Sequence, residues 1–134
     1  MRRIIVVLGA LLASVFLTVP SSAWAGSPHF VSVSASTSGN TLTVSGKEAG
    51  LGNESQVHIV VTATAQCINP GDHHPKAGNK ESFSTEGTFP VQNGKADFSL
   101  SVTATMSPNC EPPMTIAWTN IVVTDTTNGI SKNL

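Results

Sequence analysis

Residues 57 to 67 read VHIVVTATAQC, a stretch in which apolar and polar side chains alternate. The odd positions hold Val57, Ile59, Val61, Ala63, Ala65 and Cys67. The even positions are polar, with Val60 as the exception. Alternation with a period of two is typical of a strand that buries one face. The stretch therefore predicts a β-strand whose odd-numbered side chains point into a core.

Residues 95 to 106 show the same alternation in the opposite parity. The positions expected to point inward are Ala96, Phe98, Leu100, Val102, Ala104 and Met106. Asn93-Gly94 stands just before this run. This pair predicts a tight hairpin, because both residues tolerate a positive φ.

The rest of the chain favours an all-β architecture. Ser, Thr, Val, Ala and Gly dominate after residue 25, whereas Leu, Glu and Lys, which favour helices, are few. Further strands are predicted at residues 29–36, 40–46, 82–91, 114–124 and 129–133. Seven short strands punctuated by turns in one domain predict an immunoglobulin-like sandwich of two antiparallel sheets.

The first 25 residues, MRRIIVVLGALLASVFLTVPSSAWA, have the organisation of a secretory signal peptide. Two arginines at 2 and 3 precede an apolar run at 4–19, and AWA at 23–25 is a small-x-small cleavage motif. The apolar run is shorter than the roughly 20 residues of a membrane span. We expect a single domain at 26–134, secreted to the extracellular space without membrane insertion. The position of the two arginines, close to the start and to a very apolar run, disfavours the twin-arginine route, which is kept as an alternative to general export.

The expected mature domain is weakly acidic. After residue 25 the chain has five lysines, eight acids and no arginine, which gives a net charge of −3 with neutral histidines. Proteins that bind nucleic acid commonly carry a basic stripe or arginine forks, and the mature sequence has neither. Nucleic acid is therefore not an expected partner.

The chain has two cysteines, Cys67 and Cys110. If successive strands alternate in direction, the third predicted strand ends near Cys67 and the sixth begins just after Cys110. Both cysteines then lie at the same end of the sandwich. In an immunoglobulin-like arrangement these two strands are also neighbours in one sheet. In an exported protein this placement predicts a Cys67–Cys110 disulfide.

Five side chains are candidates for a binding site at the same end: Asp72, His73, His74, Lys76 and Glu111. The first four lie in a connection at residues 68–80, which is long for a hairpin loop. Carboxylate and imidazole groups can bind Zn or Cu, so Asp72, His73 and His74 are candidate metal ligands. Neighbouring histidines on an extended chain point apart, however, and an ordinary solvated loop is the favoured alternative.

The sequence contains no recognisable catalytic motif. It lacks a G-x-S-x-G elbow, an H-E-x-x-H pair and a close carboxylate pair in a known setting. A disulfide-bonded cysteine cannot be a resting nucleophile. Trp118 is in phase with Met114 and Ile116, which predicts core packing rather than a stacking platform for a ligand. We therefore expect a protein that is not an enzyme and has no cofactor.

Residues 40 to 59 read NTLTVSGKEAGLGNESQVHI, with Val44, Gly46, Gly50 and Leu51 between two predicted strands. This pattern resembles the opening half of uncharacterised small secreted bacterial immunoglobulin-like proteins. It is also similar to the apoproteins of the neocarzinostatin-type chromoproteins, which have a similar mature length and an Asn-Gly turn before a Thr/Ser-rich strand. That family binds a small aromatic antibiotic in a cleft between its strands. It carries two disulfides, whereas this chain has two cysteines in total.

These observations lead to two main hypotheses about function. The first is a non-catalytic exported interaction or surface-associated module, which binds a protein or cell-envelope partner through the loops at one sandwich end. The second, implied by the resemblance, is a small-molecule carrier, which requires an apolar cleft with convergent polar groups. A metal-binding secreted protein is a third and less favoured hypothesis.

Overall fold

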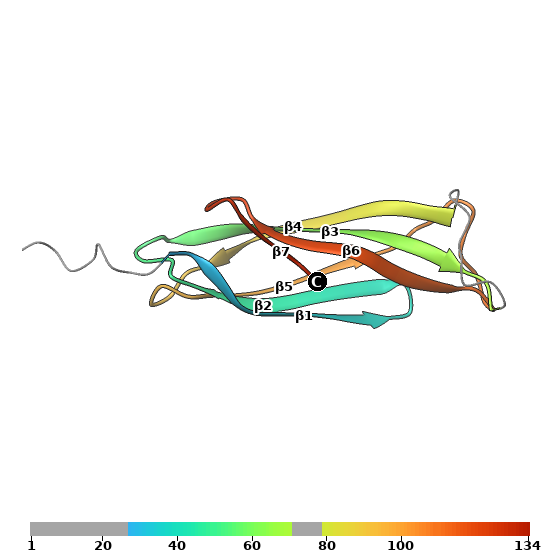
Figure 1. Cartoon of the computed structure of the whole chain (residues 1–134), viewed down its shortest axis with the longest axis horizontal. Helices are drawn as coiled ribbons and strands as arrows, with labels where there is room; N and C mark the ends of the chain where they lie inside the picture. Colours follow the sequence, from blue (N-terminus) through green and yellow to red (C-terminus); the bar gives the residue numbers. More distant parts are fainter. Residues whose placement is uncertain (1–26, 71–78) are drawn as a thin grey trace, which may run out of the picture.

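The structure is a computed structural model that describes residues 27–70 and 79–134. Within these ranges the chain forms seven strands: β1 (His29–Ser38), β2 (Thr41–Ala49), β3 (Gln56–Ile68), β4 (Lys80–Pro90), β5 (Ala96–Thr103), β6 (Thr115–Asp125) and β7 (Ile130–Asn133). They form two antiparallel sheets, β1-β2-β5 and β4-β3-β6-β7, which lie one above the other in an elongated sandwich (Figure 1). The predicted all-β, two-sheet architecture is confirmed, and its immunoglobulin-like assignment stays a prediction.

Strand β3 has the alternation that its sequence predicts. Its odd positions from Val57 to Cys67 are all buried, and its even positions are half-buried or exposed. The strand lies between β4 and β6, so that Val61, for example, pairs with Thr85 on one side and Val123 on the other. The predicted neighbourhood of the third and sixth strands is therefore confirmed.

Strands β2 and β5 differ from their predicted bounds. Strand β2 continues to Ala49, three residues beyond the expected end, and β5 ends at Thr103 instead of residue 106. Ala104 and Met106 are nevertheless buried as predicted. The Ala104 N–H donates to the Asn40 carbonyl at 2.8 Å, which attaches the segment after β5 to the β1–β2 turn.

The Asn93-Gly94 turn forms as predicted, but it does not join a regular hairpin. Both residues have positive φ, 54° and 73°, and Gln92 and Lys95 form one isolated bridge around them. Beyond that bridge β4 and β5 separate into different sheets. The physical reason is the core: Phe89 of β4 and Phe98 of β5 pack with ring centroids 6.1 Å apart. The turn thus moves the chain from one sheet to the other.

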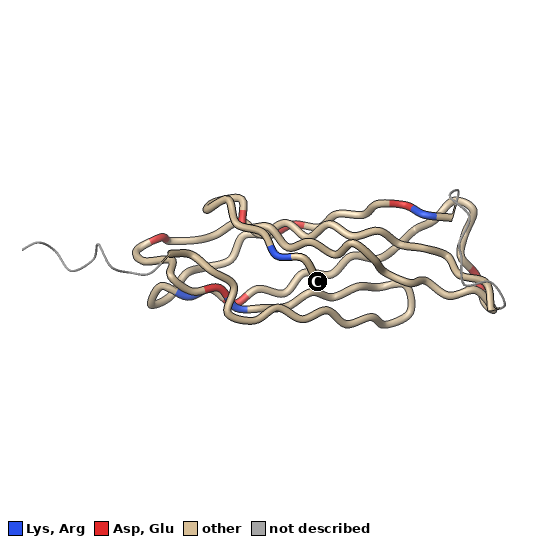
Figure 2. The backbone as a smooth tube through the Cα atoms, viewed as in Figure 1, with Lys and Arg blue, Asp and Glu red and all other residues tan. Residues whose placement is uncertain are grey.

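The space between the sheets is filled by two apolar clusters. The larger one has as its buried members Leu42, Val44, Leu51, Val57, Ile59, Val61, Ala63, Ala96, Phe98 and Val123. Trp118 packs against both clusters, and its ring meets Phe83 edge-on with centroids 5.9 Å apart. The predicted core packing of Trp118 is confirmed. Charged positions are sparse along the chain (Figure 2).

Candidate functional site

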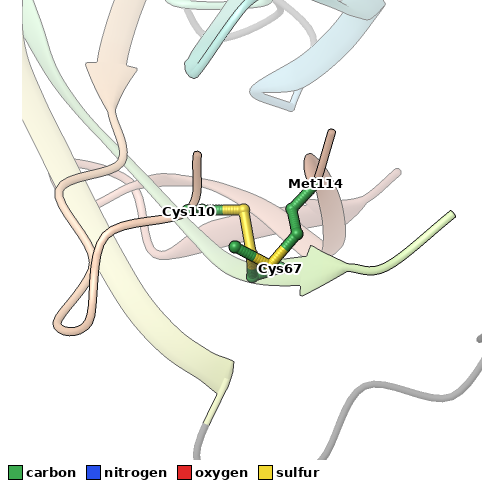
Figure 3. The surroundings of a disulfide bond; sticks show 3 residues. All are labelled: Cys67, Cys110 and Met114. Atoms are coloured by element: carbon green, nitrogen blue, oxygen red, sulfur yellow. A yellow bond between two sulfur atoms is a disulfide. The ribbon is translucent and has the colours of Figure 1, made fainter. Parts of the chain in front are cut away.

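A disulfide closes one end of the sandwich. Cys67 lies near the end of β3, and Cys110 lies in the connection between β5 and β6. The two sulfurs are bonded, with Cα atoms 5.7 Å apart (Figure 3). The structure confirms the predicted pairing and its position where β3 ends and β6 begins. We call this region, with the segment from residue 104 to 114, the disulfide end.

The smaller apolar cluster lies at the disulfide end. Its buried members are Ala65, Cys67, Ala104 and Met106, and Phe83, Cys110, Met114, Ile116 and Trp118 pack against them. The Cys67 Sγ lies 3.6 Å from the Met114 Sδ (Figure 3). This is a packing contact rather than a hydrogen bond, because a disulfide sulfur has no hydrogen to donate. The bond and its apolar surroundings attach the segment from residue 104 to 114 to β3.

A recess of about 340 Å³ opens at the disulfide end. Its lining residues are Asn40, Thr103, Ala104, Thr105, Met106, Asn109, Cys110 and Glu111, and we call it the disulfide-end recess. Ala104 and Met106 are buried, whereas Asn109 and Glu111 are exposed. The lining therefore combines an apolar part with neutral hydrogen-bonding groups and one carboxylate.

Glu111 is the predicted site residue that the structure places in this recess. Asp72, His73, His74 and Lys76 lie outside the described residues, so their proximity to Glu111 stays a prediction. The remaining two histidines lie elsewhere. The His58 ring contacts Thr88 Oγ1 at 3.0 Å and Glu86 Oε2 at 3.2 Å on the outer face of its sheet, and the His29 Nδ1 lies 2.8 Å from the Ser27 carbonyl oxygen.

Sequence reasoning missed a pair of acids at the opposite end of the sandwich. Glu48 of β2 and Asp125 of β6 are both fully buried, with 0 % of their surface exposed. Glu48 follows Leu42 and Val44 on the core-facing side of β2, and Asp125 follows Val123 on the core-facing side of β6. Each sheet therefore points one carboxyl group into the sandwich. We call Glu48 and Asp125 the acid pair.

The two acids have different surroundings. The Asp125 Oδ1 accepts hydrogen bonds from the backbone N–H groups of Thr127 at 2.8 Å and Asn128 at 3.2 Å. Its Oδ2 accepts one from the Asn128 side-chain amide at 2.6 Å, and the same amide donates to Glu54 Oε2 at 3.1 Å. No described N–H or O–H group donates to either oxygen of Glu48. Protein hydrogen-bond donors therefore surround the carboxyl group of Asp125, and the described residues provide none for that of Glu48.

The surroundings of Glu48 raise its pKa to about 8. The largest cause is burial, which disfavours the charged carboxylate, and the next is a hydrogen bond to Asp125. The negative charges of Asp125 and Glu54 act in the same direction. The neutral acid is consequently the favoured form of Glu48 at pH 7.

The acid pair left one usable signal in the sequence. Continuing the alternation of Leu42 and Val44 by two more steps reaches Glu48, but a glutamate at an inward position looks like the end of a strand. Asp125 likewise lies one residue beyond the predicted end of its strand. The sequence does not indicate that Glu48 and Asp125 are neighbours, because 76 residues lie between them.

The fold and its two ends define an all-β domain of two antiparallel sheets with one disulfide. Comparisons with models of known protein families, with curated proteins and with solved structures find no match. In the two described ranges, no three or more His, Cys, Asp or Glu side chains are grouped so as to hold a metal ion. Within residues 27–70 and 79–134, no helix has the length and apolar character needed to cross a membrane.

Proposed function

We propose that this chain is an exported, non-catalytic interaction module that binds a protein or cell-envelope partner at the disulfide-end recess. The disulfide, the signal-peptide pattern and the immunoglobulin-like strand pattern support export and the type of domain. The observation that carries the proposal is the recess itself. It lies between loops that a covalent bond and an apolar cluster hold in place, the arrangement by which sandwich domains present binding surfaces.

The lining of the recess indicates the chemistry of the partner. Asn40, Thr105 and Asn109 offer neutral donors and acceptors, Glu111 adds one negative charge, and Met106 provides apolar contact. Such a surface suits a polar, uncharged or weakly basic segment better than an anion. Neutral hydrogen-bonding surfaces of this kind match a peptide backbone or the sugars of a cell envelope.

Partner capture with matched variants tests this proposal. The wild-type domain, an Asn109→Ala/Glu111→Gln variant and a Glu86→Gln/Asn133→Ala control would be immobilised and exposed to culture medium and cell-envelope extracts. Cross-linking with mass spectrometry would then locate the contacts. We expect the recess variant to lose at least about tenfold in capture, which corresponds to about 1.4 kcal/mol, and the control to retain it. Equal capture by all three proteins, or cross-links away from the recess, would contradict the proposal.

A small-molecule carrier is the second candidate, and the combination of apolar and hydrogen-bonding groups in the lining of the recess favours it. About 340 Å³ lies within the range of 300–1,000 Å³ that is common for small-molecule sites. Native mass spectrometry of the protein from its own culture medium separates the two proposals. A bound small molecule that the Asn109→Ala/Glu111→Gln variant loses would support the carrier, and a macromolecular complex without such a mass would support the interaction module.

A further inference from the structure

The acid pair poses an electrostatic problem that the rest of the fold does not pose. Glu48 and Asp125 come from different sheets and meet in the core, at the end of the sandwich far from Cys67. Asp125 pairs with Ile59 near the start of β3, whereas Cys67 lies near its end. Two adjacent carboxylates in a desolvated place repel each other strongly, and each also loses its hydration.

The surrounding hydrogen bonds decide which acid carries the negative charge. Asp125 accepts three hydrogen bonds from Thr127 and Asn128, and these donors stabilise a carboxylate. Glu48 receives no donor in the described structure, and the polar group that it meets is the carboxyl of Asp125. A hydrogen bond between two carboxyl groups requires a proton on one of them. The arrangement therefore places the proton on Glu48.

The ionisable groups on the neighbouring elements do not change this assignment. Lys47, the residue before Glu48, points to the other face of β2 and pairs with Asp97 of β5 at 3.8 Å. The other ionisable side chains on the neighbouring elements are His29 of β1, Glu54 in the β2–β3 connection, His58 of β3, Lys80, Glu81 and Glu86 of β4, Lys95 in the β4–β5 turn and Lys132 of β7. Lys80 and Glu81 pair with Gln66 and Ala65 near the disulfide end of β3, and Glu86 pairs with His58. The charges that act on Glu48 are those of Asp125 and Glu54, and both are negative.

We propose that Glu48 and Asp125 share one proton and that this proton is a pH-dependent latch between the two sheets. With the proton in place, Glu48 donates to Asp125 and joins β2 to β6 across the core. Without it, two like charges remain in the core and push the sheets apart at this end. The latch is closed in acidic and neutral surroundings and opens in alkaline ones. If the domain works outside the cell, as the proposed function holds, the latch makes its free energy of unfolding depend on the pH of the medium.

The direction of the pH effect follows from proton linkage. The pKa of Glu48 is about 8 in the folded protein, against an ordinary value of 4.5. Between these values the folded state binds up to one proton more than the unfolded state at Glu48, so the contribution of Glu48 to stability is fully present below about pH 4.5 and is lost as the pH rises towards 8. One linked proton raises the unfolding equilibrium constant by up to about tenfold per pH unit within this window.

Urea unfolding between pH 5 and about 9 would test the latch with three proteins. The wild type should show the tenfold dependence per pH unit, superimposed on any common background. Glu48→Gln keeps a donor for Asp125 but cannot ionise, so it should lose this dependence and be the more stable protein at the highest pH. Glu111→Gln, which removes an exposed acid at the disulfide end, is the control and should retain it.

A direct titration keeps the proposal testable if Glu48→Gln does not fold. Carbon NMR of the wild type with labelled glutamate carboxyl groups should show one resonance that titrates near pH 8, far from the others. Titration of all glutamates in the ordinary range would overturn the latch. Stabilisation of the wild type by millimolar Ca²⁺, lost in Glu48→Gln, would also overturn it, because the acids would then bind a cation rather than a proton.

Discussion

The two ends of the sandwich are closed by different chemistry. At the disulfide end, a covalent bond lies over an apolar cluster and fixes the loops around a polar recess. At the other end, Glu48 and Asp125 meet in the core as the acid pair. A disulfide responds to a reductant but holds across a wide pH range, whereas a shared proton responds to pH and not to a reductant. We therefore expect that each end can be weakened without affecting the other.

Removing the disulfide should give the largest effect on stability. The bond closes a loop with a sequence separation of 43 residues, and the chain-entropy relation assigns such a loop about 4 kcal/mol. We expect Cys67→Ala together with Cys110→Ala to lower the free energy of unfolding by about this amount, measured by urea denaturation at pH 7. A reductant should weaken the wild type in the same way and leave the double variant unchanged.

The same double variant also tests whether the ends are independent. Distant sites that share no partner contribute additively to stability. The pH dependence assigned to Glu48 should therefore persist in the variant without the disulfide. If that dependence disappeared with the cysteines, the two ends would be coupled and the comparison would fail.

Gly46→Ala should give the next largest effect, and it acts near the acid pair. Gly46 occupies the core-facing position of β2 two residues before Glu48. A Cβ atom there would meet the Ser32 carbonyl oxygen and lie 2.7 Å from the Phe98 Cζ. Neither the β1 backbone nor a central aromatic ring can move away freely, so we expect a loss of about 1–3 kcal/mol in the free energy of unfolding.

Ser45→Ala is the matched control for Gly46→Ala. Ser45 is the preceding residue, and its hydroxyl pairs with that of Ser99 at 2.9 Å on the exposed face. Its replacement should cost no more than about 0.5 kcal/mol. A Gly46→Ala protein as stable as Ser45→Ala would mean that β1 adapts to the added methyl group and that packing at this end is loose.

Much of the fold could be predicted from the sequence, because the features that determine it are local. The alternation from Val57 to Cys67 depends on which face of one strand is buried, and neighbouring residues report this directly. The disulfide was predicted from strand direction, from the expected neighbourhood of the two strands and from the expectation of export. The separation of β4 and β5 could not be predicted in this way, since the Asn93-Gly94 turn specifies a reversal but not the sheet that the next strand joins.

The candidate sites were less predictable, because their members are distant in sequence. Glu111 was expected at the disulfide end, but its neighbour in the recess, Asn40, comes from a turn some 70 residues earlier. An inward glutamate such as Glu48 breaks the apolar pattern from which strands are predicted. In the proposed latch, Asp125 from the other sheet provides the acceptor for its proton.

Asn128→Ala should give the smallest of these effects, and it refines the account of the acid end. The Asn128 amide donates to Asp125 Oδ2 and Glu54 Oε2, and its loss leaves two carboxylates with fewer donors. We expect a cost of about 1 kcal/mol at pH 5, measured by urea denaturation. The cost should be greater at pH 9, where Glu48 has also lost its proton and the loss of a donor to Asp125 leaves two charged carboxylates less stabilised.

Asn133→Ala, on the exposed surface of β7, should show neither effect. A cost that does not change with pH would mean that Asn128 supports the turn alone and contributes nothing to the charge balance of the acid pair.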